Sequence, residues 1–262
     1  MVCVASTLLI LSADAARAVS ARLKLVNDAA LSRKRPALTC RRMSPDEGIS
    51  LKWDFCTLAD HLGRAVQAAE EDLRLEQAVY GLDARDERSL QATLAERLRG
   101  AYEVAREVHY PSSKGRKLTH RMRCDLVLSP RGLPLKLDSA PPSLFDPPAM
   151  CQPGDALWLE VKTAYQFREG GVRHGGYGAQ WRQHVVDDLR KMEADPLIRE
   201  AGLVLVVFNE SQAILDKDLE LFEDVLARKE VLAGFRQVRS VPILDRVGHR
   251  VCTVAVWPTI QR

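Results

Sequence analysis

The sequence lacks several features that would assign it to a class directly. It contains no P-loop, no GxSxG nucleophile motif and no dinucleotide-binding fingerprint. No apolar run reaches the roughly 20 residues that a membrane-spanning helix needs, so we expect no membrane partner. The six cysteines include no CxxC pair and the histidines form no zinc pattern, which argues against a zinc site. Cysteines scattered in this way are typical of reduced thiols and predict a cytoplasmic location.

A large excess of one charge is also absent, since the net charge is +3 over 262 residues and the pI is near 8.5. A balance this mild does not by itself indicate a nucleic-acid partner. The cations are nevertheless concentrated between residues 114 and 136, where seven Lys or Arg residues accompany a single acid, Asp125. Such a segment fits a surface that meets polyanions, with a solvated basic loop as the alternative. Its candidate nucleic-acid contacts are Lys114, Arg116, Lys117, Arg121 and Arg123.

The first 52 residues show no pattern of a packed domain. An apolar stretch followed by small residues superficially resembles a secretory signal, but no Lys or Arg precedes it and Asp14 follows it closely. A basic stretch interrupted by prolines comes next and is typical of a linker or a disordered arm. We therefore expect a linker-like N-terminal segment at residues 1–52 and a compact domain at residues 53–262.

The compact domain shows clear periodicities. Apolar residues recur at helical spacing over residues 55–80, 86–100, 179–194 and 216–229. Strand patterns cover residues 102–110, 123–129, 157–167 and 201–209, and residues 235–243 and 251–257 predict a hairpin. This order predicts an α/β fold with a mixed β-sheet of about five to six strands flanked by helices. The stretch 201–209 is continuously apolar and should be central in the sheet.

Two charges interrupt the apolar strand at residues 157–167. Glu160 and Lys162 lie two positions apart, so their side chains point to the same face. Burying them is unfavourable unless they pair with each other, a metal or a ligand. Asp125 opens the preceding strand, and pairing of adjacent strands would bring it level with Glu160.

These residues predict a magnesium site. Carboxylates and a backbone carbonyl are ligands that Mg²⁺ prefers, so Asp125, Glu160 and the Val161 carbonyl are the expected metal ligands. Lys162 beside the ion could orient or activate a water for attack on phosphorus, or stabilise the charge that develops there. The alternative is a structural ion pair between Glu160 and Lys162.

The same residues resemble a known family. Asp125, then 34 intervening residues, then Glu160-Val161-Lys162 is similar to the motif of the PD-(D/E)xK nuclease superfamily, which has the restriction-endonuclease-like fold. The likeness covers a core of about residues 86–209 and includes the order of the elements. It implies a Mg²⁺-dependent nuclease, with Mn²⁺ as a substitute ion, that hydrolyses DNA phosphodiester bonds in restriction, defence or repair. Asp125, Glu160 and Lys162 would be catalytic.

Members of this family often carry a glutamate on the helix before the first strand. Glu87 and Glu96 are the two candidates, and nine residues at 100° each place them about 180° apart on the helix. Glu87 shares its side with Gln91 and Leu94 near the inward face, so we assign the catalytic role to Glu87.

Further contacts are expected after the motif strand. A loop with five glycines at residues 168–178 carries Arg173, and the following helix presents a polar side with Gln180, His184, Asp188 and Lys191. Gln180 is the preferred substrate contact because it lies nearest the helix N-terminus, where phosphate is attracted.

Three alternatives stay open. They are a catalytically inactive nucleic-acid-binding module, an RNA-directed nuclease, and an interaction protein with a structural ion pair at Glu160 and Lys162. A homodimer is expected only by analogy with duplex-cutting members of the family.

Overall fold

The structure is a computed structural model that describes residues 53–113, 122–136 and 149–260. Its helices are α2 (Phe55–Leu75), α3 (Glu87–Leu98), α4 (Tyr177–Glu193) and α5 (Gln212–Arg228). Its strands are β1 (Tyr102–His109), β2 (Arg123–Pro130), β3 (Leu157–Tyr165), β4 (Phe167–Arg168), β5 (Val172–Arg173), β6 (Glu200–Asn209), β7 (Gln237–Pro242) and β8 (Val251–Pro258). The segment expected to be linker-like, residues 1–52, lies outside the described residues.

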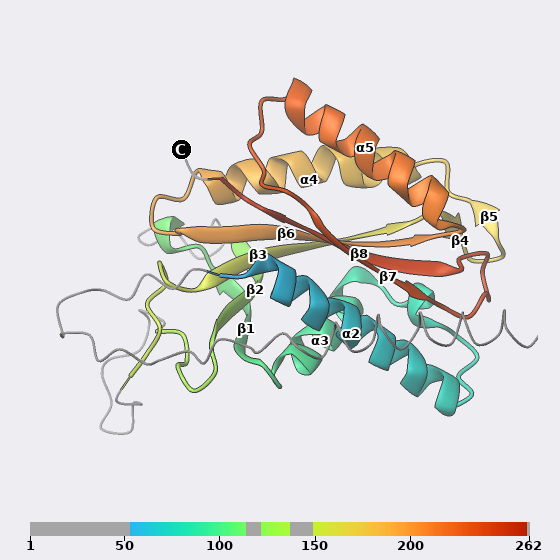
Figure 1. Ribbon diagram of the computed structural model, residues 1–262, viewed down its shortest axis with the longest axis horizontal. Coiled ribbons are helices and arrows are strands. Elements are labelled where there is room, and N and C mark those ends of the chain that lie inside the picture. The colour runs from blue at the N-terminus through green and yellow to red at the C-terminus, as the bar shows by residue number, and fades with distance from the viewer. Residues whose placement is uncertain (1–52, 114–121, 137–148, 261–262) are drawn as a thin grey trace, which may run out of the picture. The chain divides into compact units, whose positions relative to one another are not determined.

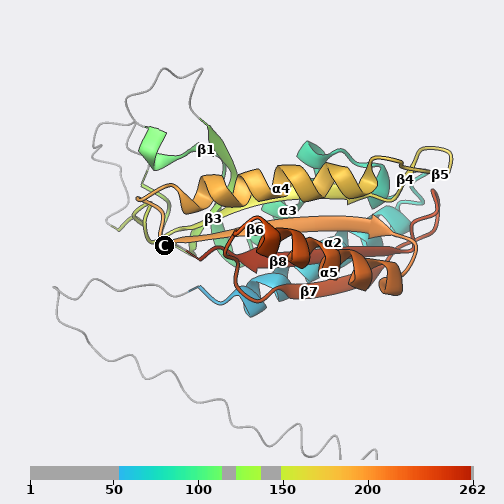
Figure 2. The ribbon, with the colours of Figure 1, turned by 90° about the horizontal axis from the view of Figure 1, so that it is seen from above.

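The main sheet has the strand order β1-β2-β3-β6-β8-β7, with β3 and β6 parallel and every other neighbouring pair antiparallel. Helices α4 and α5 cover one face of this sheet, and α2 and α3 cover the other (Figure 1). Seen from above, α4 runs along the sheet over β3 (Figure 2). The described residues therefore form an α/β fold with a six-stranded mixed sheet flanked by helices, as the order of the periodicities predicted.

The strand β6 is the centre of this sheet, as its continuous apolar run predicted. It pairs with β3 on one side and β8 on the other, and every residue from Ala201 to Asn209 is buried. Leu203, Leu205 and Val207 contribute to the core beneath α4 and α5. Val204, Val206 and Phe208 contribute to the core beneath α2 and α3. Alternation along one buried strand thus supplies both layers of the core.

The helices begin where side chains cap them. The carboxylate of Asp54 accepts a hydrogen bond from the Cys56 backbone nitrogen at 2.9 Å, and that of Asp86 accepts one from the Ser89 nitrogen at 2.7 Å. The prediction that the first helix continues to Tyr80 is wrong, because α2 ends at Leu75. Leu75 and Val79 are 83% and 82% exposed. Beyond this point the helix has no sheet surface to cover, so its apolar residues no longer favour another turn.

Other boundaries also differ from the predictions. The motif strand was expected to run to Phe167, but β3 ends at Tyr165, and Phe167–Arg168 pairs instead with Val172–Arg173 in a short hairpin. This hairpin occupies the stretch expected to be a glycine loop, with Gly170 and Gly171 at positive φ in its turn. The helices α4 and α5 begin at Tyr177 and Gln212 rather than at 179 and 216. Among the described residues, no helix combines the length and apolar composition needed to cross a membrane.

The close packing of α2 on the sheet generates a stability prediction. A Cβ on Gly202 of β6 would lie 2.7 Å from Phe55 Cε1 and 3.0 Å from the Trp257 carbonyl oxygen. We expect Gly202→Ala to lower the free energy of unfolding by about 1–3 kcal/mol through overpacking, measured by urea denaturation. Gly175→Ala is the matched control, because a Cβ there meets nothing within 4 Å. Equal stability of the two variants would contradict this packing.

Candidate active site

The candidate site lies where β2 and β3 separate, a place called the fork from here on. Pairing between these strands covers only Leu126 with Leu159, Val127 with Trp158, and Leu128 with Leu157. Beyond Leu159, β3 continues to Tyr165 and stays paired with β6 on its other edge. The backbone groups on the open edge of β3 therefore need hydrogen-bond partners other than a strand.

Three side chains from two elements provide those partners. The Asp125 carboxylate of β2 accepts a hydrogen bond from the Val161 backbone nitrogen at 2.8 Å. From α3, Gln91 donates to the Val161 carbonyl oxygen at 3.4 Å, and the Glu87 carboxylate accepts from the Thr163 backbone nitrogen at 3.2 Å. The open edge of β3 is thus completed by predicted site residues, and this places Asp125 and Glu87 at fixed positions along it.

The Glu160 side chain is buried beside this edge, with the residue 2% exposed. Its Oε1 accepts a hydrogen bond from the Tyr110 hydroxyl at 2.5 Å and lies 2.6 Å from Lys191 Nζ of α4. The Tyr110 ring stacks on Trp158 at 5.8 Å and lies beneath the Lys191 ammonium. Glu160 is therefore held from two directions through one oxygen.

Lys162 lies between two acids that come from opposite sides of the sheet. Its Nζ is 3.6 Å from Glu87 Oε1 on α3 and 3.4 Å from Asp188 Oδ2 on α4. The other oxygen of Asp188 is 3.1 Å from Lys191 Nζ. One chain of alternating charges consequently surrounds the fork, in the order Glu160, Lys191, Asp188, Lys162 and Glu87.

Burial and like charge raise the pKa of both central carboxyls. Desolvation raises the pKa of Asp125 most, against the opposing effect of the hydrogen bond from Val161. Desolvation and then the negative charge of Asp125 raise the pKa of Glu160 to about 7, although Lys191 acts in the opposite direction. Both carboxyls therefore favour a shared proton or a cation over two free negative charges.

The two lysines are held in their charged forms. Burial by itself lowers the pKa of Lys162, but Asp188 and Glu87 outweigh it and the net shift is upward. Lys191 follows the same pattern, with Glu160 as the main charge that raises its pKa. Both side chains therefore present ammonium groups, which act as hydrogen-bond donors and not as bases.

The donor set fits Mg²⁺. Asp125 and Glu160 supply hard carboxylate oxygens, and burial, together with neighbouring negative charge, raises the pKa of both carboxyls. Mg²⁺ is held by one or two carboxylates and keeps several waters, so two carboxylates and the Val161 carbonyl are sufficient. Within the part of the chain that the structure describes, no three His, Cys, Asp or Glu side chains gather as a metal-binding group.

The structure brings five predicted residues together, namely Glu87, Asp125, Glu160, Val161 and Lys162. Glu96 is exposed and pairs with Arg99, as its position on the opposite side of the helix predicted. Arg123 is exposed at the first residue of β2, and Arg173 is exposed on β5 beside Glu210. Gln180 belongs to α4, but its side chain lies outside the described residues, as do the predicted contacts Lys114, Arg116, Lys117 and Arg121.

Sequence reasoning missed Tyr110 and Thr163 and ranked Gln180 above Asp188 and Lys191. Tyr110 closes the first predicted strand, and no charge or motif marks it. Asp188 and Lys191 carry a signal, because an acid and a base three residues apart share one side of a helix. That signal does not say which end of the helix lies over the motif strand, and the packing of α4 on β3 decides it.

In comparisons with known proteins, no family model, curated protein or solved structure matches this chain.

The raised pKa of Glu160 predicts a pH dependence of stability. Its pKa is about 7 in the folded protein against a reference value of 4.5, so ionisation is less favourable in the folded state. This carboxyl's contribution is fully present below pH 4.5 and is lost as the pH rises through 7. With chelator present, we expect wild type to lose stability over that range relative to Glu160→Gln, measured by urea unfolding. If the free energy of unfolding changes with pH in the same way for wild type, Glu160→Gln and the exposed control Glu96→Gln, the raised pKa of Glu160 is contradicted.

Proposed function

We propose that this protein is a Mg²⁺-dependent nuclease of the restriction-endonuclease-like type that hydrolyses DNA phosphodiester bonds. The observation that carries the proposal is the convergence of the motif residues at one fork. The Asp125 carboxylate lies against the Val161 backbone, between Glu160 and Lys162, although 34 residues separate Asp125 from Glu160 in the sequence. Glu87, chosen from the helix before the first strand, reaches both Lys162 and Thr163.

In this proposal Asp125 and Glu160 hold the ion, with the Val161 carbonyl as a further ligand. When bound, Mg²⁺ supplies positive charge that polarises the scissile phosphate. A water oxygen would form a bond to phosphorus and lose a proton to solvent while the bond to the leaving oxygen breaks, and the leaving oxygen would take up a proton from solvent.

Lys162 acts as the donor that faces the phosphate. Its pKa is raised, so it carries a positive charge at neutral pH and stabilises negative charge that builds up on the phosphate oxygens. The pairing with Glu87 and Asp188 fixes the position of the ammonium from two sides. A donor that is already oriented needs little reorganisation when charge develops.

Lys191 supports the site from α4. It lies 2.6 Å from the Glu160 oxygen, and its positive charge lowers the pKa of that carboxyl against the effect of burial. We assign it a positioning role, because its ammonium acts on the substrate only through Glu160.

DNA is the substrate that the resemblance favours, and the surroundings of the site support a polyanion. The exposed Arg123 begins β2 two residues before Asp125, and the exposed Arg173 lies on β5. An RNA-directed nuclease would use the same residues, so the experiment below compares DNA and RNA as substrates.

The first experiment measures cleavage of plasmid DNA, single-stranded DNA and single-stranded RNA with Mg²⁺ or Mn²⁺. We expect metal-dependent cleavage of DNA by wild type, and a loss of about 10²- to 10³-fold in rate for Glu160→Ala and Lys162→Ala. Glu160→Ala removes a ligand of the ion, and Lys162→Ala removes the ammonium group that stabilises charge on the phosphate. Glu96→Ala is the matched control, since it is exposed on the same helix as Glu87. Circular dichroism checks that every variant is folded.

The outcomes of this experiment separate the alternatives. Cleavage of RNA alone would correct the substrate and keep the mechanism. Folded wild type that binds nucleic acid and cleaves neither DNA nor RNA would replace the nuclease by a binding module. If Lys162→Ala lowers stability and changes no activity, the ion pairs of Lys162 are structural.

The role of Lys191 predicts a change in the pH profile. In Lys191→Ala, Glu160 loses the charge that lowers its pKa, so the pH at which cleavage rises should move upward. The rate at neutral pH should fall about tenfold for each unit of that movement. Arg190→Ala is the control, because Arg190 is exposed on α4 and contacts the Lys229 carbonyl. A lower rate with an unmoved pH profile would make the contribution of Lys191 purely structural.

A further inference from the structure

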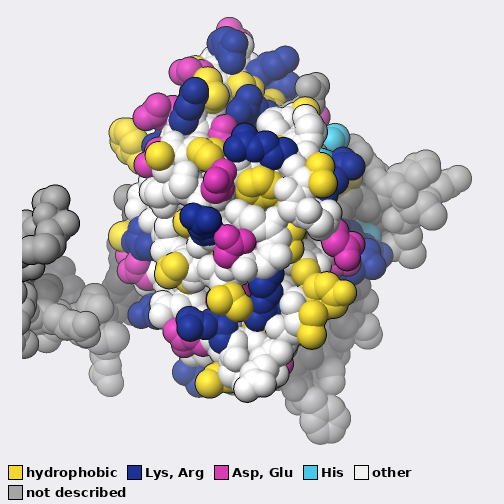
Figure 3. Space-filling model, turned by 90° about the vertical axis from the view of Figure 1, so that its right-hand side faces the viewer, with side chains coloured by type: hydrophobic (Ala, Val, Ile, Leu, Met, Phe, Trp, Pro, Cys, Tyr) yellow, Lys and Arg dark blue, Asp and Glu magenta, His cyan; other side chains and the backbone are white. Residues whose placement is uncertain are grey.

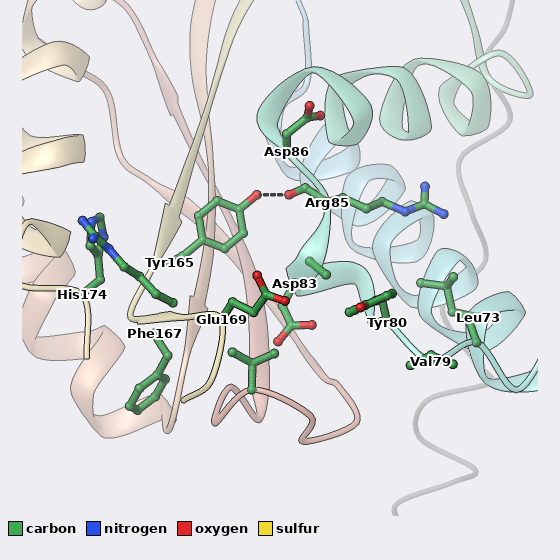
Figure 4. Close-up of a pocket in the computed structure, with 15 residues that line it drawn as sticks. Leu73, Val79, Tyr80, Asp83, Arg85, Asp86, Tyr165, Phe167, Glu169 and His174 are labelled. Atoms are coloured by element: carbon green, nitrogen blue, oxygen red, sulfur yellow. Dashed lines mark hydrogen bonds between the residues drawn. The ribbon is translucent and has the colours of Figure 1, made fainter. Parts of the chain in front are cut away.

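A cavity of about 950 Å³ lies beside the candidate site, at the end of β3 (Figure 4). Its walls come from the end of α2, the connection between α2 and α3, the end of β3 and the β4–β5 hairpin. Most of the lining is apolar, and three aromatic residues contribute to it: Tyr80, Tyr165 and Phe167. This volume lies in the range of pockets that bind small organic groups.

The cavity lies next to the candidate site along the chain, although none of the site residues lines it. Asp86 lines it and is followed directly by Glu87, which contacts Lys162. Tyr165 lines it three residues after Lys162 on the same strand. Tyr165 and Lys162 are an odd number of positions apart on β3, so their side chains lie on opposite faces of the sheet. A strand whose phosphate lies at Lys162 would therefore bring its neighbouring nucleotide to this cavity by passing around the open edge of β3.

Tyr165 forms a rigid aromatic surface in this cavity. One face of its ring stacks on the buried Phe208, with the ring centroids 5.1 Å apart and the planes 5° from parallel. Its hydroxyl donates a hydrogen bond to the Arg85 carbonyl oxygen at 2.5 Å, drawn in Figure 4. The ring is thus held on one face and at its tip, and it lines the cavity, where a planar ligand could stack on it.

A buried acceptor belongs to the lining of the same cavity. Asp83 is 7% exposed, and its Oδ2 is bound to His249 Nδ1 at 2.8 Å. The other ring nitrogen of His249 accepts a hydrogen bond from the Phe167 backbone nitrogen, so Nδ1 carries the proton. The second carboxylate oxygen, Oδ1, is buried and has no hydrogen-bond partner among the described residues. Such an oxygen favours a ligand that brings an N–H group.

The rim around the cavity is compatible with a phosphate chain. The face of the molecule that carries β4 and β5 shows basic, acidic and apolar side chains interspersed, without a broad acidic surface (Figure 3). Arg168 is exposed in the lining of the cavity, to which the acids Asp86 and Glu169 also belong. Its guanidinium is a suitable contact for a phosphate next to a bound base.

We propose that this cavity binds a nucleobase of the substrate strand adjacent to the cleaved phosphate. The inference rests on the proposed function and names a subsite for it. The base stacks on the Tyr165 ring and directs an amino group toward Asp83. Cytosine, adenine and guanine carry such a group and thymine does not, so the subsite favours the first three.

The test measures binding to short single strands of equal length by fluorescence anisotropy, using wild type with the metal chelated. The strands are oligo-dC, oligo-dT and an abasic strand with the same number of phosphates. We expect oligo-dC to bind about tenfold more tightly than the abasic strand, with oligo-dT between them. Tyr165→Leu should remove the difference between oligo-dC and the abasic strand, and Tyr165→Phe should keep it because the ring remains.

Equal affinity of wild type for all three strands would overturn the subsite, as would an unchanged preference in Tyr165→Leu. The comparison among strands uses wild type alone, so it stands even if Tyr165→Leu fails to fold. Free dCMP that binds as tightly as oligo-dC, with the same dependence on Tyr165, would assign the cavity to a free nucleotide and overturn its assignment to the strand.

A parallel cleavage assay separates this inference from the proposed function. Base-dependent binding without cleavage would contradict the proposed nuclease activity and support the nucleobase subsite. Metal-dependent cleavage together with base-independent binding would support the proposed nuclease activity and contradict the nucleobase subsite.

Discussion

The open edge of β3 is the constraint on which the rest of the structure depends. A strand that extends beyond its paired neighbour leaves backbone N–H and C=O groups that need other hydrogen-bond partners. In this protein the partners of Val161 and Thr163 are the polar side chains of Asp125, Gln91 and Glu87. The same hydrogen bonds that complete the sheet therefore hold two carboxylates beside Glu160 and Lys162. Structure and candidate chemistry share these contacts, so each acid is oriented before any ligand binds.

Charge balance then determines what this fork can hold. Glu87, Asp125, Glu160 and Asp188 surround two ammonium groups, Lys162 and Lys191. Because the Asp125 and Glu160 carboxyls both have raised pKa values, the cluster favours added positive charge. A buried network of purely structural ion pairs would reach balance within itself. The excess of carboxylate at the point where β2 and β3 diverge is the physical argument for a cation there.

Sequence reasoning recovered the parts of this arrangement that follow from local periodicity. Alternation placed Glu160 and Lys162 on one face, and helical geometry separated Glu87 from Glu96. The register of two adjacent strands is a simple consequence of their pairing, so Asp125 could be placed as well. Tyr110 and Lys191 could not be placed, because their contacts depend on how a strand end and a helix pack across the sheet. The early end of α2 likewise reflects missing tertiary contacts, which no window of sequence contains.

The connection between α2 and α3 links the cavity to the fork. Asp83 in this connection is fixed by His249, and His249 in turn accepts the hydrogen bond from Phe167 that anchors the start of the β4–β5 hairpin. Three residues after Asp83, Asp86 both caps α3 and lines the cavity. The first residue of α3 is Glu87, which contacts Lys162. The lining of the cavity and the Glu87–Lys162 pair are therefore held by one continuous segment of chain, which His249 fixes at one end and the α3 cap at the other.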